Sequence, residues 1–160
     1  VSASHAVRDV GLTVLGRGTP NVTVELVVMS ADGNGEPSEQ LVDAVKTRVL
    51  AKDVKMLTDV VIVRRAVAVP YGVSATLRVQ PGPDPNVIRQ AALTSVQAMA
   101  ESAAYKRIGG GVPHSALVAA LHVPGVDSVV NVRPAGDVAT QRHQFALLTA
   151  TSIDVEVIRG

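Results

Sequence analysis

Residues 105–134 read YKRIGGGVPHSALVAALHVPGVDSVVNVRP, and this stretch is more informative about the chain than any other part. The triplet Gly109–Gly111 predicts the end of a helix, because a residue without a Cβ readily adopts the left-handed backbone found there. Ser115 to Leu121 then predicts a short amphipathic helix. The Pro124-Gly125 pair predicts a turn, and the valine-rich segment Val126 to Val132 predicts a β-strand.

The residues before the glycines predict a long helix from Pro85 to about Arg107. Its polar side chains form one stripe along the helix, and nearly every other residue is small or apolar. We therefore expect this helix to be buried on more than one side. The stripe consists of Gln90, Thr94, Gln97 and Glu101, and the alanines that widen the apolar surface are Ala91, Ala92, Ala98, Ala100, Ala103 and Ala104.

Alternation of apolar and polar residues predicts the strands, because successive side chains of a strand point to opposite faces. Val22 to Val28 and Tyr71 to Val79 alternate most regularly. The second of these is expected to belong to a sheet with one face open to solvent or to a partner. Shorter strands are expected at Val10–Leu15, Val60–Val63 and Ile153–Val157.

A first helix is expected from Ser38 to about Ala51. Pro37 and Ser38 form a favourable helix start, and Glu39 places an acid in the first turn, where the helix dipole favours it. The apolar residues Leu41, Val42, Val45 and Val49 then fall on one side of the helix.

This order of elements predicts an α+β fold with a mostly antiparallel sheet. The simplest packing is a split β-α-β, ferredoxin-like core with the helices on one side and extra strands at both termini. We expect residues 1–20 to form an amino-terminal strand and connector, residues 21–133 to form the α+β core domain, and residues 134–160 to form a loop and strand on or next to that core. Because residue 1 is valine, we also expect a fragment of a longer protein.

The composition argues against several classes of function. Apolar residues make up 47% of the chain but aromatic residues only 2%, which leaves few stacking platforms for single-stranded nucleic acid or sugars. The 15 basic and 14 acidic residues are scattered, so no charged footprint for nucleic acid or anionic lipid is visible. There is no cysteine, and no apolar run approaches the ~20 residues of a membrane-spanning helix.

The four histidines do not predict a metal site. Only His114 and His122 share a helical neighbourhood, and eight residues of helix separate them by roughly 12 Å of rise, which is too far for one ion. The glycines before Pro113 could cradle an anion, but they lack the Lys-Ser or Lys-Thr that follows a phosphate-binding loop. A helix stop is the alternative interpretation of these glycines.

Nucleophilic catalysis is a further alternative, although the chain lacks a G-x-S-x-G motif. The candidate nucleophiles stand where helices are expected to start, so capping of those helices is the competing role. The candidates are Ser38 and Ser115, with His114 or His143 as base and Asp127 or Asp137 as the group that orients it.

Arg64 and Arg65 interrupt an otherwise apolar strand. One interpretation is that the pair lies at an edge or a contact of the sheet. The other is that the charges keep a sheet edge soluble, and the sequence leaves both interpretations open.

The order of motifs in residues 105–134 resembles the carboxy-terminal part of the baseplate J-like proteins of contractile phage tails. In that family I-G-x-x-V-x-x-S-x-L-x-x-x-L is followed by x-x-P-G-V and a valine strand. The segment Gly33 to Ser38 is similar to the family's G-x-P-S segment before its first helix. Leu57 to Val63 is similar to the x-T-D-x-V-x-V start of a strand, with Leu57 where proline is common. The likeness covers roughly Asn21 to Val157, without the family's usual amino-terminal portion.

The resemblance implies a structural subunit rather than an enzyme. Such proteins build the wedges of the baseplate around the tail tube, so the expected partners are other wedge proteins and copies of the chain itself. The expected location is the virion tail baseplate, after assembly in the bacterial host cytoplasm. No cofactor, metal, nucleic acid, membrane or small-molecule substrate is expected. The candidate structural or interaction residues are Pro37, Ser38, Asp59, Arg64, Arg65, Gly109, Ser115, Pro124, Gly125 and Val126.

Two other hypotheses remain. The chain could be a small α/β hydrolytic or ligand-binding domain that uses the turn from Gly109 to Ser115. It could also bind nucleic acid, which would show as steeply salt-dependent affinity for DNA or RNA.

Overall fold

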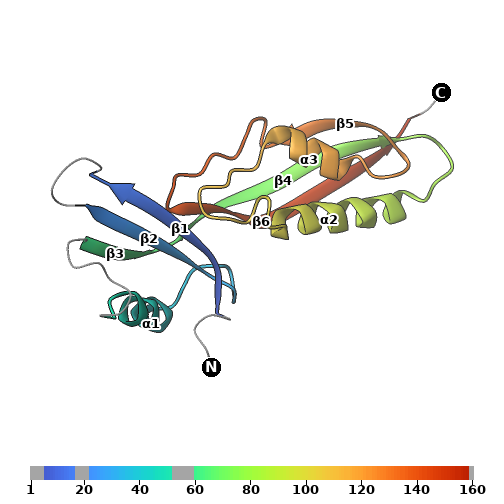
Figure 1. Cartoon of the computed structure of the whole chain (residues 1–160). Helices are drawn as coiled ribbons and strands as arrows, with labels where there is room; N and C mark the ends of the chain where they lie inside the picture. Colours follow the sequence, from blue (N-terminus) through green and yellow to red (C-terminus); the bar gives the residue numbers. More distant parts are fainter. Residues whose placement is uncertain (1–5, 17–21, 52–59, 159–160) are drawn as a thin grey trace. The chain divides into compact units, whose positions relative to one another are not determined.

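The computed structural model describes residues 6–16, 22–51 and 60–158 of the chain (Figure 1). Asp59 and the first part of the segment 57–63 therefore lie outside the described residues. The described elements are β1 (Val7–Leu15), β2 (Thr23–Ser30), α1 (Glu39–Val49), β3 (Val60–Arg65), β4 (Val67–Val79), α2 (Pro85–Glu101), α3 (His114–Leu121), β5 (Val126–Arg133) and β6 (Gln144–Val157).

The described residues divide into two compact units. The first unit takes the chain up to Ala68 together with residues 107–109 and 141–145, and the second unit takes most of the remainder. These units cut the chain at other places than 20/21 and 133/134. The predicted division into residues 1–20, 21–133 and 134–160 stays a prediction.

The first unit is built on the sheet β1-β2-β3. β2 pairs antiparallel with β1 and parallel with β3, with Glu25 opposite Thr13 on one side and Ile62 on the other. The helix α1 begins as predicted, because the Ser38 hydroxyl accepts a hydrogen bond from the Leu41 N–H at 3.2 Å and so caps the first turn.

Met29 and Phe145 are the largest fully buried side chains of the first unit. Gly35 lies against both, with a positive φ of 99°, and a Cβ there would stand 2.9 Å from Met29 Cε and 3.0 Å from the Phe145 ring. The β2 face that carries Glu25 and Val27 is more buried than the face that carries Val24 and Leu26. The alternation therefore predicts this strand, although its better-buried face carries the polar Glu25 and not Val24 and Leu26.

The second unit is built on the sheet β5-β4-β6. In β4 the residues Tyr71, Val73, Ala75, Leu77 and Val79 are buried while those between them are exposed or half-buried, as the alternation predicts. The buried side chains pack with those of α2 and α3 into one core, so both helices cover the same face of the sheet (Figure 1). The other face stays open.

The α+β class is confirmed, but one mostly antiparallel, ferredoxin-like sheet is not. The described strands form two three-stranded mixed sheets. In the second sheet β5 is antiparallel to β4, whereas β6 runs parallel to β4, with Val67 N–H donating to His143 O and Ile158 N–H donating to Val79 O. Alternation reports which side of a strand is buried and carries no information about the direction of its neighbour, which is why the sequence did not predict this pairing.

The helix α2 ends at Glu101, about six residues before the predicted end. Ser102 leaves the helical conformation and its hydroxyl donates to the Met99 carbonyl at 2.7 Å, so a serine and not the glycine triplet ends the helix. Burial on more than one side is also wrong for the described chain. Ile88, Ala92, Val96 and Ala100 are buried, whereas Ala91, Ala98, Ala103 and Ala104 are exposed.

Candidate functional site

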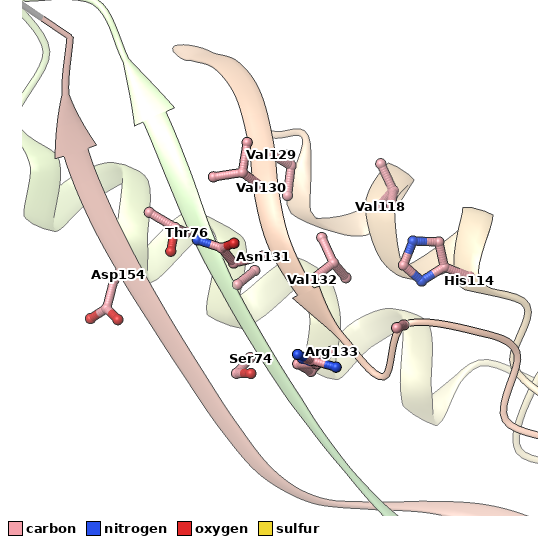
Figure 2. A pocket seen from close by; sticks show the side chains of 12 residues that line it. Ser74, Thr76, His114, Val118, Val129, Val130, Asn131, Val132, Arg133 and Asp154 are labelled. Atoms are coloured by element: carbon pink, nitrogen blue, oxygen red, sulfur yellow. The ribbon is translucent and has the colours of Figure 1, made fainter.

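The open face of the sheet β5-β4-β6 is hollowed into a depression of about 780 Å³ (Figure 2). The middle strand β4 presents the short side chains of Ser74 and Thr76 to this depression, and the longer side chains of Arg133 and Asp154 come from the outer strands. His114 and Val118 of α3, which packs on the other face of the sheet, border the depression beyond the edge strand β5.

A bulge in β5 shapes the same depression. The register shifts between the pairs Ser74–Arg133 and Thr76–Val130, so β5 has one extra residue there. Asn131 lies at the irregularity with a positive φ of 54°, which asparagine tolerates better than most residues. The bulge leaves Asn131 and Arg133 both exposed beside the depression.

Most charged groups on the open face are already paired. Arg78 Nε lies 3.2 Å from Glu156 Oε2, and the Gln80 amide donates to Asp127 Oδ1 at 3.3 Å. In contrast, Arg133 and Asp154 have no ion pair or side-chain hydrogen bond among the residues that the structure describes. Within the described part of the chain, this face therefore exposes one unpaired cation on β5 and one unpaired anion on β6.

The start of α3 is held by a loop that follows β5. Val112 and Val138 exchange two backbone hydrogen bonds of 3.0 and 2.8 Å, and the His114 N–H donates to Asp137 Oδ1 at 2.8 Å. The ring nitrogen Nδ1 of His114 lies 3.0 Å from the Pro134 carbonyl oxygen. Asp137 thus takes the capping role predicted for Ser115, which makes no side-chain cap; this prediction was wrong.

In the first unit, a buried carboxylate binds two arginines. The side chain of Glu25 is 7% exposed, with Arg64 Nε at 2.8 Å and the Arg142 guanidinium at 3.8 Å. Arg65 reaches only the exposed carboxylate of Glu39, at 3.7 Å. Arg64 therefore makes a contact within its own sheet. Arg65 lies on β3, which is the exposed edge strand of that sheet.

A second polar cluster lies at the end of α2. Lys106 is buried and its ammonium donates to both carboxylate oxygens of Glu101 at 2.7 Å. Burial raises the pKa of the Tyr71 hydroxyl above its usual value, and the negative charge of Glu101 raises that pKa further.

The remaining candidate residues serve turns and caps. Pro37 is buried beside the capping Ser38, and Gly109 has a positive φ of 68° and donates its N–H to Gln144 O at 2.7 Å. Gly125 has a positive φ of 95° in the turn after Pro124, and Val126 is buried at the start of β5. Pro37, Ser38 and Gly109 belong to the first unit, whereas Pro124, Gly125 and Val126 belong to the second. The unpaired Arg133 and Asp154 were not predicted, because their significance depends on strand order.

The described residues contain no group of three or more His, Cys, Asp or Glu side chains placed to hold a metal ion. No described helix has the length and apolar character needed to cross a membrane.

Comparison with known proteins gives two matches. The family model described as "Baseplate J-like protein C-terminal domain" matches residues 71–154. The chain is also 34% identical over 149 residues to the protein named "Baseplate protein J" of Escherichia phage P2. That alignment covers 92% of this chain and 47% of the phage P2 protein, so the chain spans about half the length of its relative.

Proposed function

Because the chain belongs to the baseplate J-like proteins, matching their C-terminal domain, we propose that it is a structural subunit of the baseplate of a contractile phage tail or a phage-like injection machine. The observation that carries this proposal is the family match over residues 71–154. That range runs from the buried part of β4 through α2, α3 and β5 to Asp154 of β6. It therefore includes the sheet, both helices and the depression of the second unit.

The subunit contributes to the wedges of the baseplate, contacts other wedge proteins and copies of itself, and is located in the virion after assembly in the host cytoplasm. The open sheet face supports this role, because a polar surface with unpaired charges suits a contact that forms during assembly. The interaction candidates from the sequence, including Arg64, Arg65 and Pro124 to Val126, remain proposals for such contacts.

We propose no catalytic role. In the turn from Gly109 to Ser115, on which the hydrolytic alternative depends, His114 and Gly109 make structural hydrogen bonds. His114 binds Asp137 and the Pro134 carbonyl, and the Gly109 N–H binds Gln144.

The test is deletion of the gene from the phage or prophage that encodes the chain, with complementation by a tagged copy. We expect tails without complete baseplates by electron microscopy after deletion, and the tag at the distal end of purified tails after complementation. Infectious particles of normal form in the absence of the gene would overturn the proposal.

A further inference from the structure

We propose that the outer edge of β6 and the groove between β6 and α2 bind an extended segment of another baseplate protein, which adds a fourth strand to the sheet β5-β4-β6. The segment carries an apolar side chain for the groove and an acidic side chain for Arg89. This proposal rests on the proposed baseplate role, because it takes the segment from a neighbour in the same assembly. It deepens that role by naming the surface and the chemistry of the partner.

The first support is the free backbone edge of β6. Within the described part of the chain, β4 is the only strand that pairs with β6, so the other edge of β6 is open. The Ile158 N–H donates to the Val79 carbonyl of β4 at 2.9 Å. Because successive residues of a strand direct their N–H and C=O groups to alternate sides, the backbone groups of Val155 and Val157 point away from β4. Such groups bind another backbone in an extended conformation.

The second support is a groove of about 450 Å³ beside this edge, between α2 and β6. All of its lining residues belong to the second unit. Leu93 of α2 and Leu148 of β6 are partly buried against the core, so they offer apolar surface to a side chain that enters from outside. Ala100 and Ala150 also line the groove, and their short side chains leave room for a larger group.

The third support is the charge of Arg89, which lies one turn before Leu93 on the same side of α2. Because α2 begins soon after β4 ends beside β6, Arg89 lies near the end of β6 where Val155 and Val157 direct their backbone outward (Figure 1). Arg89 is half-buried, and its Nε is buried without a hydrogen-bond partner among the described residues. A carboxylate on the bound segment supplies the missing partner.

The other charges near this edge are either compensated or on the opposite face of the sheet. Glu101 lines the groove, but the Lys106 ammonium donates to both of its carboxylate oxygens at 2.7 Å. Asp154 and Glu156 of β6 border depressions on the open face, which α2 does not cover, and Glu156 is paired with Arg78. The side of α2 that faces the groove therefore favours an acidic group.

The experiment measures binding of the full chain to overlapping synthetic peptides that tile the other tail proteins encoded with it, by fluorescence anisotropy. We expect the bound peptides to contain an apolar residue and an acidic residue. Methylation of their backbone nitrogens, one at a time, is the sharpest test, because it removes one donor. In an added strand, methylation at every second residue should weaken binding about tenfold, and methylation at the residues between should have little effect.

Variants of the chain test the two ends of the contact. Arg89→Gln should weaken binding of the acidic peptides about tenfold, and it should have no effect on peptides whose acid is replaced by its amide. Arg48→Gln on the exposed surface of α1 is the matched control and should bind like the unchanged chain. Val157→Pro removes an N–H that points away from β4, so it should abolish binding in a folded chain. Circular dichroism checks that each variant is folded.

Failure of every tiling peptide to bind at near-millimolar concentration would overturn the proposal. Binding that is indifferent to Arg89→Gln and to backbone methylation would do the same, as would sensitivity at the three- or four-residue spacing of a helix. Because the readout is peptide binding in solution, its failure leaves the deletion phenotype and the proposed baseplate role unaffected.

Discussion

At the first turn of α3, the carboxylate of Asp137 accepts the hydrogen bond that a capping side chain next to the helix would normally accept. Asp137→Ala removes this acceptor and should lower the free energy of unfolding by about 1 kcal/mol. Urea denaturation measures the change. Ser115→Ala is the matched control, because Ser115 makes no side-chain cap and should cost less than half as much. Equal losses for the two variants would contradict this assignment of the cap.

Gly111 lies against the backbone of Val138, and this close contact gives a second test at the scale of one residue. A Cβ at this position would stand 2.5 Å from the Val138 carbonyl oxygen, which accepts the hydrogen bond from the Val112 N–H. Gly111→Ala should therefore force the two segments apart and cost about 1–3 kcal/mol of stability.

Gly136→Ala is the matched control for this variant. A Cβ at Gly136 would have no neighbour within 4 Å, so the change should be neutral or slightly stabilising. Melting temperatures of both variants, measured by calorimetry, decide the outcome. A Gly111→Ala protein as stable as the unchanged chain would show that this close approach is not required.

These residue-scale roles show where sequence reasoning succeeds. The cap at Ser38 could be predicted, because the hydroxyl and the N–H that it binds are three residues apart. The cap at Asp137 could not, because its acceptor lies 23 residues from the helix start in the chain. The ion pair of Glu25 with Arg64 could not be predicted from the sequence either, since it depends on the pairing of β2 with β3.

At the scale of elements, two neighbouring arginines of strand β3 form ion pairs of different kinds, one with a buried carboxylate and one with an exposed carboxylate. Among the described residues, Arg64→Ala leaves the buried carboxylate of Glu25 with only the longer contact to Arg142, and it should cost about 1–3 kcal/mol. Arg65→Ala removes a pair with an exposed carboxylate and should cost less than about 0.5 kcal/mol. Urea denaturation of both variants measures the difference.

A double variant tests the physical cause of that difference. Glu25→Gln together with Arg64→Ala removes the buried charge along with its partner, so it should recover part of the stability lost in Arg64→Ala. No recovery would show that Arg64 acts through the packing of its side chain and not through its charge.

The elements themselves were predicted better than their arrangement. Alternation located β4 closely, and the Pro-Gly turn located the start of β5, because both signals are local. The end of α2 was predicted too late, since the serine that ends the helix is a weaker sequence signal than the glycines after it. The first nine residues of β6, from Gln144 to Ser152, were missed, because Phe145 and Ala146 are both buried and interrupt the alternation there.

At the scale of the whole molecule, family membership was predicted correctly from the order of turns and apolar segments. The match to the family model begins at Tyr71 and ends at Asp154, so it includes the Pro-Gly turn and the valine strand that carry the resemblance. The open face was predicted from the alternation in β4, but strand direction and the charges that the outer strands bring to this face could not be predicted, because they depend on long-range pairing. Sequence order therefore identifies the family, whereas the directions of the strands come from the structure.

The stability of the whole molecule should depend on alkaline pH through Tyr71. Its pKa is raised in the folded chain by burial and by the charge of Glu101, so the folded state favours the neutral hydroxyl. The contribution is fully present below the unfolded pKa near 10 and is lost as pH rises through the higher folded pKa, because the unfolded chain then releases its proton first. Tyr71→Phe should therefore lose less stability than the unchanged chain between about pH 9 and pH 11, measured by urea denaturation. Parallel curves for the two proteins over this interval would contradict the coupling between burial of Tyr71 and folding.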